Sequence, residues 1–432
     1  MPLWPQAGLW RHADFLRLWG GQTISQFGQQ IGQLAIPLAA ILVLDASAFE
    51  VALLGTVEFL PFLLFTLPAG VWVDRLPRRP ILILGDLGRA AALASVPLAY
   101  ALDLLTIWQL FAVGFAVGTL TVFFDVAYQT YLPSLVERKQ LVEGNSLLEI
   151  SRNGAQIAGP GAGGALVGAL TAPVAILLDA VSFLASALLL LRIRTVEPRI
   201  GPAEHANMRR ELTEGLGYLL RHRYWRPMAL TTGASNFFWM ICGSILLVYA
   251  VRSLGMSPEV IGLVLTLGSL GGLAGAFAAG RLSRRFGVGP TIVGASVLFG
   301  PPLILVPLAP ESAPIPVLVL SFLLSTAGGT IYVITGLSLM QTLTPERLLG
   351  RMNASRRFIV FGSIPLGSLA GGLLASSIGL RPTLWVGAVG ACFCFLPIAL
   401  SPIRQLGAMP TEPEPDPLPL GAPLPVGVHL DA

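Results

Sequence analysis

The stretch GVWVDRLPRR, Gly70 to Arg79, places one aspartate and three arginines in a short loop between two long apolar runs. A related stretch, GRLSRRFG, begins 210 residues later at Gly280 and also follows an apolar run. Asn145 and Asn353 repeat at an offset of 208, as do the glycine pairs that begin at Gly163 and Gly371. Loops that recur at a near-constant offset predict a duplicated unit with parallel repeats.

The composition places these loops in a membrane protein. Of the 432 residues, 54% are hydrophobic and 12% are charged, whereas a soluble domain carries about 25% charged residues. A span of the hydrocarbon layer takes about 20 apolar residues. We therefore predict an all-α polytopic membrane protein with twelve transmembrane helices, at about 14–44, 50–73, 80–102, 106–130, 144–168, 173–193, 226–252, 258–282, 288–309, 315–342, 355–379 and 382–400.

The distribution of basic residues predicts the orientation. Short connections make adjacent helices antiparallel, and 24 of the 27 lysines and arginines then fall on one side, against two on the other. Cytoplasmic loops carry the excess of basic residues, so both termini are expected in the cytoplasm of a multi-pass inner-membrane protein. The net charge of +4 reflects these loops and does not indicate nucleic-acid binding.

The repeat and the connections divide the chain into four parts. We expect a six-helix bundle at 1–194, a cytoplasmic linker at 195–225, a second six-helix bundle at 226–402 and a disordered proline-rich cytoplasmic tail at 403–432. The basic amphipathic stretch at 208–226 is typical of a helix that lies along the membrane surface. Cys242, Cys392 and Cys394 lie in apolar runs, so we expect neither a metal site nor a cofactor.

Two six-helix halves with a repeated cytoplasmic loop resemble the major facilitator superfamily over about 10–402. Gly70, Asp74, Arg75, Arg78 and Arg79 resemble its loop motif between helices 2 and 3, although Pro77 stands where a glycine is usual. GPGAGG, Gly159 to Gly164, resembles the helix-5 motif of drug–proton antiporters. LRLWGGQTISQFGQQIGQLAIPL and YLPSLVERKQLVEGNSL resemble the branch that holds enterobactin-type siderophore exporters and macrolide efflux proteins.

The resemblance implies a non-enzymatic exporter of amphipathic small molecules that works as a monomer by proton antiport. A lysophospholipid or lipid flippase on the same fold is an alternative. A membrane-embedded enzyme would need clustered catalytic groups, and a receptor would need an output domain, and the sequence offers neither. The identity of the substrate stays open.

The loop motif implies a gate between the halves. By resemblance, Asp74 lies beside the start of helix 11, where a carboxylate stabilises the positive helix end by about 0.3–1 kcal/mol. Arg78 would pair with Asp125, the candidate acid near the inner end of helix 4. Alternatively, Asp125 carries protons or is a solvated acid at a helix end.

The helix-5 motif favours tight packing. Gly159, Gly163 and Gly164 permit close approach of helix backbones, and Pro160 is expected to kink the helix. The resemblance implies that this helix seals the exit. Plain packing without a link to transport direction is the alternative.

The stretch GGQTISQFGQQIGQ, Gly20 to Gln33, gives helix 1 a polar face. At about 100° per residue, its glutamines gather on one side, opposite Ile24, Phe27 and Ile31. Unpaired amides facing lipid are costly, so the face lines a cavity or bonds to a neighbouring helix. We take the cavity as the hypothesis, with these candidate substrate contacts: Gln26, Gln30, Gln33, Asn236, Phe238, Trp239 and Tyr332. For the aromatic residues, packing is the alternative.

A few charges lie within the predicted spans, and such residues are candidates for function. Glu149 and Arg152, like Asp86 and Arg89, are three residues apart and are expected to pair. Glu58 and Asp179 have no evident partner. Because a carboxylate shielded from water holds a proton more readily, we list Glu58 and Asp179 as the main proton-coupling candidates, beside Glu149 and Arg152.

Overall fold

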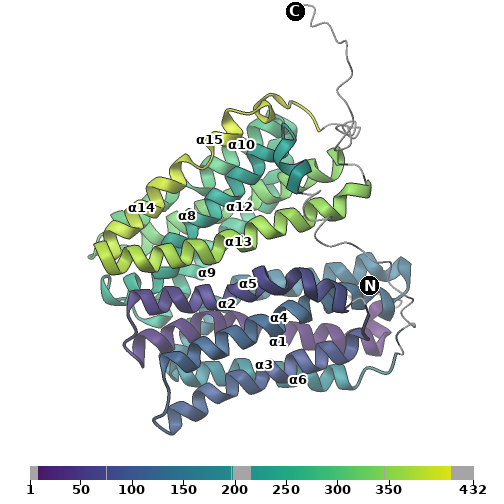
Figure 1. The fold of residues 1–432 in the computed structure, drawn as a ribbon, viewed down its shortest axis with the longest axis vertical. Coiled ribbons are helices and arrows are strands. Elements are labelled where there is room, and N and C mark those ends of the chain that lie inside the picture. Colours follow the sequence, from purple (N-terminus) through teal and green to yellow (C-terminus); the bar gives the residue numbers. More distant parts are fainter. Residues whose placement is uncertain (1–7, 74, 196, 198–215, 345, 410–432) are drawn as a thin grey trace, which may run out of the picture.

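The computed structural model describes the chain except residues 1–7, 74, 196, 198–215, 345 and 410–432 (Figure 1). The described chain is helical throughout, with short connections. Ten helices are long and apolar enough to cross a membrane. α1 (Ala13–Leu42) and α5 (Leu141–Ala169) are as long but carry more polar residues, and they complete the twelve predicted spans.

The remaining helices follow the predicted ranges closely. The first half holds α2 (Ala48–Val73), α3 (Arg78–Ala101), α4 (Ile107–Leu135) and α6 (Ala172–Leu191). The second half holds α8 (Trp225–Arg252), α9 (Pro258–Phe286), α10 (Val288–Phe299), α11 (Leu305–Leu308), α12 (Pro314–Leu343), α13 (Glu346–Ile378), α14 (Leu380–Phe393) and α15 (Leu396–Ala399). Short 3-10 turns occur at η1 (Leu9–Arg11), η2 (Arg138–Gln140), η3 (Pro301–Ile304) and η4 (Pro402–Gln405).

The structure corrects the predicted spans in two ways. α13 begins at Glu346 rather than near 355, because its first turns are charged and a count of apolar residues misses them. The ninth and twelfth spans are each interrupted, after α10 by a turn with two prolines and after α14 just before Pro397. Proline lacks the N–H that a continuous helix needs, so each of these spans is built from two helices.

The helices form two bodies. In Figure 1, α1–α6 lie together in one and α8–α15 in the other. In the first, α1 packs against α5 and α6, and α3 packs against α4 and α6. In the second, α9 packs against α12, and α8 packs against α13 and α14. The twelve helices in this arrangement make the major facilitator fold.

Both described chain ends lie at the same end of the helix bundles, which we call the terminal face. There the guanidinium of Arg17 donates to the carbonyl of Arg192 at 2.8 Å, and the amide of Gly289 donates to the carbonyl of Leu406 at 2.8 Å. The other end, the opposite face, carries tight turns. Two of these turns place Asp45 and Asp103 in the left-handed region, at φ 49° and 56°.

The two bodies touch mainly over the half of the molecule nearer the opposite face. α2 packs along α13, and α5 packs along α9. The Ser368 hydroxyl donates to the carbonyl of Ala52 at 2.7 Å, and the Arg252 guanidinium donates to the Asp45 carboxylate at 2.6 Å. Toward the N-terminus the bodies diverge (Figure 1), and Val142 on α5 is 78% exposed there. The molecule is therefore closed near the opposite face and open toward the terminal face.

Candidate transport site

A cavity lies within the second body. It has a volume of about 340 Å³ and is walled by α8, α10, α12 and α13. Two of the predicted contacts line it, Asn236 on α8 and Tyr332 on α12. The Tyr332 hydroxyl lies 2.9 Å from that of Thr232 and donates to the carbonyl of Met228 at 3.2 Å. We call this space the large cavity.

The other two predicted aromatic contacts do not line the large cavity. Trp239 stacks on Phe299 with ring centroids 5.2 Å apart and meets Phe322 edge-on. Phe238 packs against Gly390 of α14, where an added Cβ would collide with its ring. Successive helix residues are about 100° apart, so Phe238 lies on nearly the opposite side of α8 from Asn236. In this structure Phe238 and Trp239 therefore make packing contacts with neighbouring helices, as in the alternative to substrate contact.

The sequence analysis missed several residues that line the large cavity. Trp225, Met228 and Thr232 line it from the same face of α8 as the predicted Asn236, at a spacing of three or four residues, which is the signal that could have found them. Arg356 on α13 also lines it. It was counted only as a basic residue of the terminal face, because its position over the cavity depends on how α13 packs.

The glutamines on the polar face of α1 lie in three different environments. Gln22 is buried, 4% exposed. Gln30 packs against Gly159 of α5, and Gln33 is exposed. None of Gln26, Gln29, Gln30 and Gln33 has a side-chain hydrogen bond to a described residue. This arrangement gives no support to the hydrogen-bonding alternative and leaves the amides of Gln26 and Gln33 free to contact a substrate.

A second, smaller cavity of about 50 Å³ lies within the first body. Gln29, Gln33, Glu58, Thr121 and Asp179 contribute its polar lining. The structure thus brings together Glu58 of α2 and Asp179 of α6, which the sequence offered only as separate candidates. We call this space the acidic cavity.

Two glycines of α1 make room for one of these carboxylates. An added Cβ at Gly28 would lie 2.8 Å from Asp179 Oδ1, and one at Gly32 would collide with Oδ2. Asp179 is 3% exposed, and its carboxylate accepts a weak hydrogen bond from Ser182 at 3.4 Å. Glu58 has no hydrogen bond or ion pair to a described residue. The acidic cavity therefore holds two carboxylates that form no ion pair with a basic side chain of the described residues.

The predicted Asp86–Arg89 pair borders the acidic cavity. The two side chains form an ion pair at 2.5 Å, 0% and 3% exposed. The guanidinium lies 4.2 Å from the ring centroids of Phe124 and Phe183. It also approaches the Thr121 hydroxyl at 3.5 Å. Arg89 pairs directly with Asp86 and is near enough to attract the charge of Asp179, but among the described residues it forms no ion pair with either acid of the cavity.

Glu149 and Arg152 also pair, at 3.6 Å, but both are more than half exposed. Arg152 and Arg357 of α13 are both close enough to attract the charge of Asp125. These four side chains therefore belong to the opening between the bodies. Glu149 and Arg152 do not form the buried site that a shielded proton carrier needs.

Most of the predicted gate is open in this structure. Asp74 lies outside the described residues, Gly70 has nothing within 4 Å of an added Cβ, and Arg75 is exposed. Asp125 is exposed, and it forms no ion pair with Arg78. The structure does not form this predicted pair, although Arg78 on α3 and Asp125 on α4 belong to helices that pack against each other within the first body.

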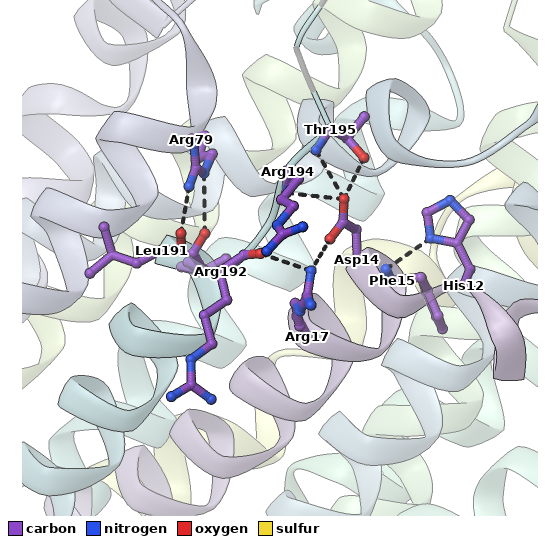
Figure 2. Close-up of polar contacts among 10 residues, drawn as sticks. His12, Asp14, Phe15, Arg17, Arg79, Leu191, Arg192, Arg194 and Thr195 are labelled. Carbon is purple, nitrogen blue, oxygen red and sulfur yellow. Dashed lines mark hydrogen bonds and ion pairs between the residues drawn. The ribbon is translucent and has the colours of Figure 1, made fainter.

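The start of α3 is held by an acid that the sequence analysis missed. The Glu197 carboxylate accepts hydrogen bonds from the main-chain amides of Arg78 and Arg79, at 2.8 and 2.7 Å. A carboxylate at this position satisfies free N–H groups and the positive end of the helix. The Arg79 guanidinium donates to the carbonyls of Leu190 and Leu191, at 3.1 and 2.7 Å (Figure 2).

Asp14 fastens the same segment to α1. Its carboxylate accepts hydrogen bonds from the amides of Arg194 and Thr195, at 3.1 and 2.9 Å, and from the Thr195 hydroxyl at 2.7 Å (Figure 2). Its other oxygen pairs with Arg17 at 2.5 Å. The chain that leaves α6 is thereby tied to the starts of both α1 and α3.

The helix-5 glycines serve two interfaces. An added Cβ at Gly159 would collide with Gln30, and one at Gly163 would lie 3.2 Å from the Ile31 Cα, so both face α1. Gly164 faces the other body, where an added Cβ would lie 2.8 Å from the Gly262 Cα. α5 runs as one helix through Pro160. The predicted close approach of backbones is present, both within a body and between bodies.

Comparison with known proteins agrees with this architecture. Residues 6–420 match the family model described as transmembrane secretion effector. The multidrug efflux pump Tap of Mycolicibacterium fortuitum is 28% identical over 354 residues, 78% of this chain and 84% of that protein. Macrolide efflux protein A of Streptococcus pyogenes is 23% identical, covering 91% of this chain and 97% of its own.

A solved structure shares the fold. A bacterial homologue of the iron transporter ferroportin in an inward-facing state superposes with a TM-score of 0.73 over 91% of this chain and 99% of that chain, at 18% identity. The chain thus belongs to the transmembrane secretion effector family, a group of non-enzymatic major facilitator transporters.

Proposed function

We propose that this protein exports amphipathic small molecules across the cytoplasmic membrane by alternating access coupled to proton antiport. The observation that carries the proposal is the coexistence of the large cavity, which is mostly apolar with a few polar groups, and the separate acidic cavity. Ligand pockets for amphipathic compounds have this mainly apolar lining. The family relatives named as multidrug and macrolide efflux pumps support export, and siderophores are a further substrate class by resemblance.

We infer that the terminal face is cytoplasmic. The 24-to-2 distribution of basic residues supports this orientation, and the present conformation is then inward-facing. Single cysteines in the turn 103–106 should react with an impermeant thiol reagent added outside intact cells, and those at 196–207 should not. The reverse labelling would overturn the orientation.

The division of the chain into four parts follows from the same proposal. The halves at 1–194 and 226–402 would move as the two bodies, with 195–225 as the cytoplasmic linker and 403–432 as a cytoplasmic tail. Each monomer would transport alone, because both cavities lie within one chain.

Substrate would enter the opening between the bodies and contact Gln26 and Gln33 on one side and Asn236 and Tyr332 on the other. Gln30 would lie at the edge of this surface, against Gly159. Protons would bind at Glu58 and Asp179, since two close carboxylates cannot easily both stay charged away from water. Return of the protons to the cytoplasm would then accompany reclosure near the opposite face.

Inverted membrane vesicles with an imposed pH gradient test the proposal. An acidic interior should drive accumulation of ethidium or labelled erythromycin by the wild-type protein. Glu58→Gln and Asp179→Asn should each remove the dependence on the gradient. The matched control is Asp103→Asn, which removes a carboxylate in an exposed turn and keeps a residue type that tolerates the left-handed region.

Two results would count against the proposal. Wild-type vesicles that accumulate neither compound under any gradient would contradict proton-coupled export of this class. Gradient-driven accumulation that survives both acidic-cavity substitutions would place the proton site elsewhere.

A further inference from the structure

The two cavities differ in the sign of their charge. Among the described residues that line them, the large cavity has Arg356 and no acidic side chain, whereas the acidic cavity has Glu58 and Asp179 and no basic one. A cavity that carried only amides and aromatic rings would accept compounds of any charge. The large cavity carries a cation, so an occupant with an anionic group would gain an interaction that a neutral or cationic one lacks.

Arg356 lacks a counter-ion among the side chains that the structure describes. It forms no ion pair and no hydrogen bond with a described residue. Its Nε atom is buried without an acceptor. The nearest charge along α13 is Arg357, which repels it. Removing a guanidinium partly from water costs free energy when it has no partner. A bound anion would form the ion pair with Arg356 that no described residue forms.

Two more donors in the wall of the large cavity lack acceptors. Trp225 and Thr231 are 2% and 1% exposed, and the indole Nε1 and the threonine hydroxyl oxygen have no hydrogen-bond partner in the described part of the chain. Indole N–H is only a donor, and buried polar groups in native proteins are nearly always satisfied. A ligand that carries several acceptor oxygens would satisfy them.

The rest of the wall suits an apolar body of variable shape. Met228, Met340 and Met352 line it, with the rings of Phe299 and Tyr332. Methionine side chains are flexible and polarisable and adapt to irregular partners. The volume of about 340 Å³ lies at the lower end for ligand pockets.

We propose that the large cavity selects amphipathic organic anions, with a carboxylate or sulfonate paired to Arg356 and the apolar body among the methionines and aromatic rings. This inference rests on the proposed function and narrows its substrate class. Arg356 is then a specificity-determining residue.

A matched pair of probes tests the charge preference directly. 1-Naphthylacetate and 1-naphthylacetamide have the same ring and nearly the same size, and only the former is an anion. Calorimetric titration of the full chain in nanodiscs of neutral lipid should show about tenfold or tighter binding of the acetate, as expected for a charge-assisted hydrogen bond. Arg356→Gln should remove this preference and leave the affinity for the acetamide within about twofold, whereas Arg356→Lys should retain part of it.

Two further variants locate the effect. Arg284→Gln removes an exposed charge from the last turn of α9, outside the large cavity, and should change neither affinity. Val333→Trp, at a cavity-lining position that is 51% exposed, should fill space and weaken both probes alike.

The inference is overturned if wild-type protein binds neither probe, shows no preference, or keeps its preference after Arg356→Gln. Unchanged binding in Val333→Trp would also overturn it, since the probes would then bind elsewhere. The vesicle assay separates this outcome from the proposed function, because gradient-driven accumulation of ethidium or erythromycin reports proton-coupled export whatever the charge preference of the large cavity.

Discussion

Gly164 of α5 and Gly262 of α9 face each other across the contact between the two bodies. A Cβ on Gly262 would lie 2.9 Å from the Gly164 Cα, and one on Gly164 would lie 2.8 Å from the Gly262 Cα. This spacing is closer than real Cβ atoms adopt, so only glycine at both positions allows the present closure near the opposite face.

Gly164→Ala is expected to destabilise this closed contact and shift the protein toward an opening at the opposite face. Cysteine labelling at Gln33 from the outside should increase, and transport should fall. Gly154→Ala is the matched control, because it lies on the same helix and an added Cβ there has nothing within 4 Å. Equal labelling in the two variants would contradict this function of the glycine contact.

The carboxylate of Glu197 should stabilise the start of α3, which it contacts directly although the two lie more than one hundred residues apart in the sequence. Glu197→Gln keeps the size of the side chain and loses the charge, and the loss of such a helix-end interaction costs about 1 kcal/mol. Thermal unfolding followed by tryptophan fluorescence should show a midpoint lowered by roughly 1–3 °C. Glu311→Gln, at an exposed position between α11 and α12, should leave the midpoint unchanged; a similar fall there would remove the explanation.

Gln33 and Gln22 offer a test of the glutamine face. Cysteines at Gln26 and Gln33 should react with a water-soluble thiol reagent, whereas a cysteine at Gln22, which is 4% exposed, should not. Gln33→Leu should weaken those substrates that bond to the amide by about 0.5–1.5 kcal/mol and leave others unchanged. Gln22→Leu should alter stability and leave substrate preference alone. Equal loss for every substrate in Gln33→Leu would indicate a structural function.

The gate at the terminal face is expected to close through opposite charges from the two bodies. Asp125 lies close enough to Arg357 of α13 to attract it while the face is open, and closure would shorten that separation. Asp125→Arg and Arg357→Asp should each increase labelling of cysteines at the terminal face by about a few-fold, as an exposed ion pair allows. Exchange of the two charges in one protein should restore the wild-type pattern.

Asp74→Asn should also increase labelling of cysteines at the terminal face. The family motif implies that Asp74 stabilises the start of the eleventh span, which is α13, and the substitution removes that charge. If the double exchange labels like either single variant, Asp125 and Arg357 do not pair. If Asp74→Asn labels like wild type, the motif acts through another contact.

The twelve spans could be predicted from the sequence because a membrane helix is specified locally. Each span satisfies its own backbone hydrogen bonds in lipid, so length and apolar content are enough to find α2 or α4. The repeated motif at Gly70 and Gly280 and the ion pair of Asp86 and Arg89 could also be predicted, since they depend on offsets along the chain. The second copy of the motif is not the expected loop, because α9 continues through it to Phe286. Charged or proline-rich ends, as in α13 and α10, were placed less well because they break the apolar pattern.

The sites themselves depend on helices that are far apart in the chain. Glu58 and Asp179 were each candidates, but only the tertiary packing of the first body, with Asp179 of α6 against Gly32 of α1, brings them to one cavity. Arg356 counted as one more basic residue until α13 placed it over the large cavity, and Phe238 turned away from that cavity on α8. Hydropathy finds which segments are helices, but it does not contain the rotation of each helix about its axis. That rotation is decided by tertiary packing, and with it the side chains that meet.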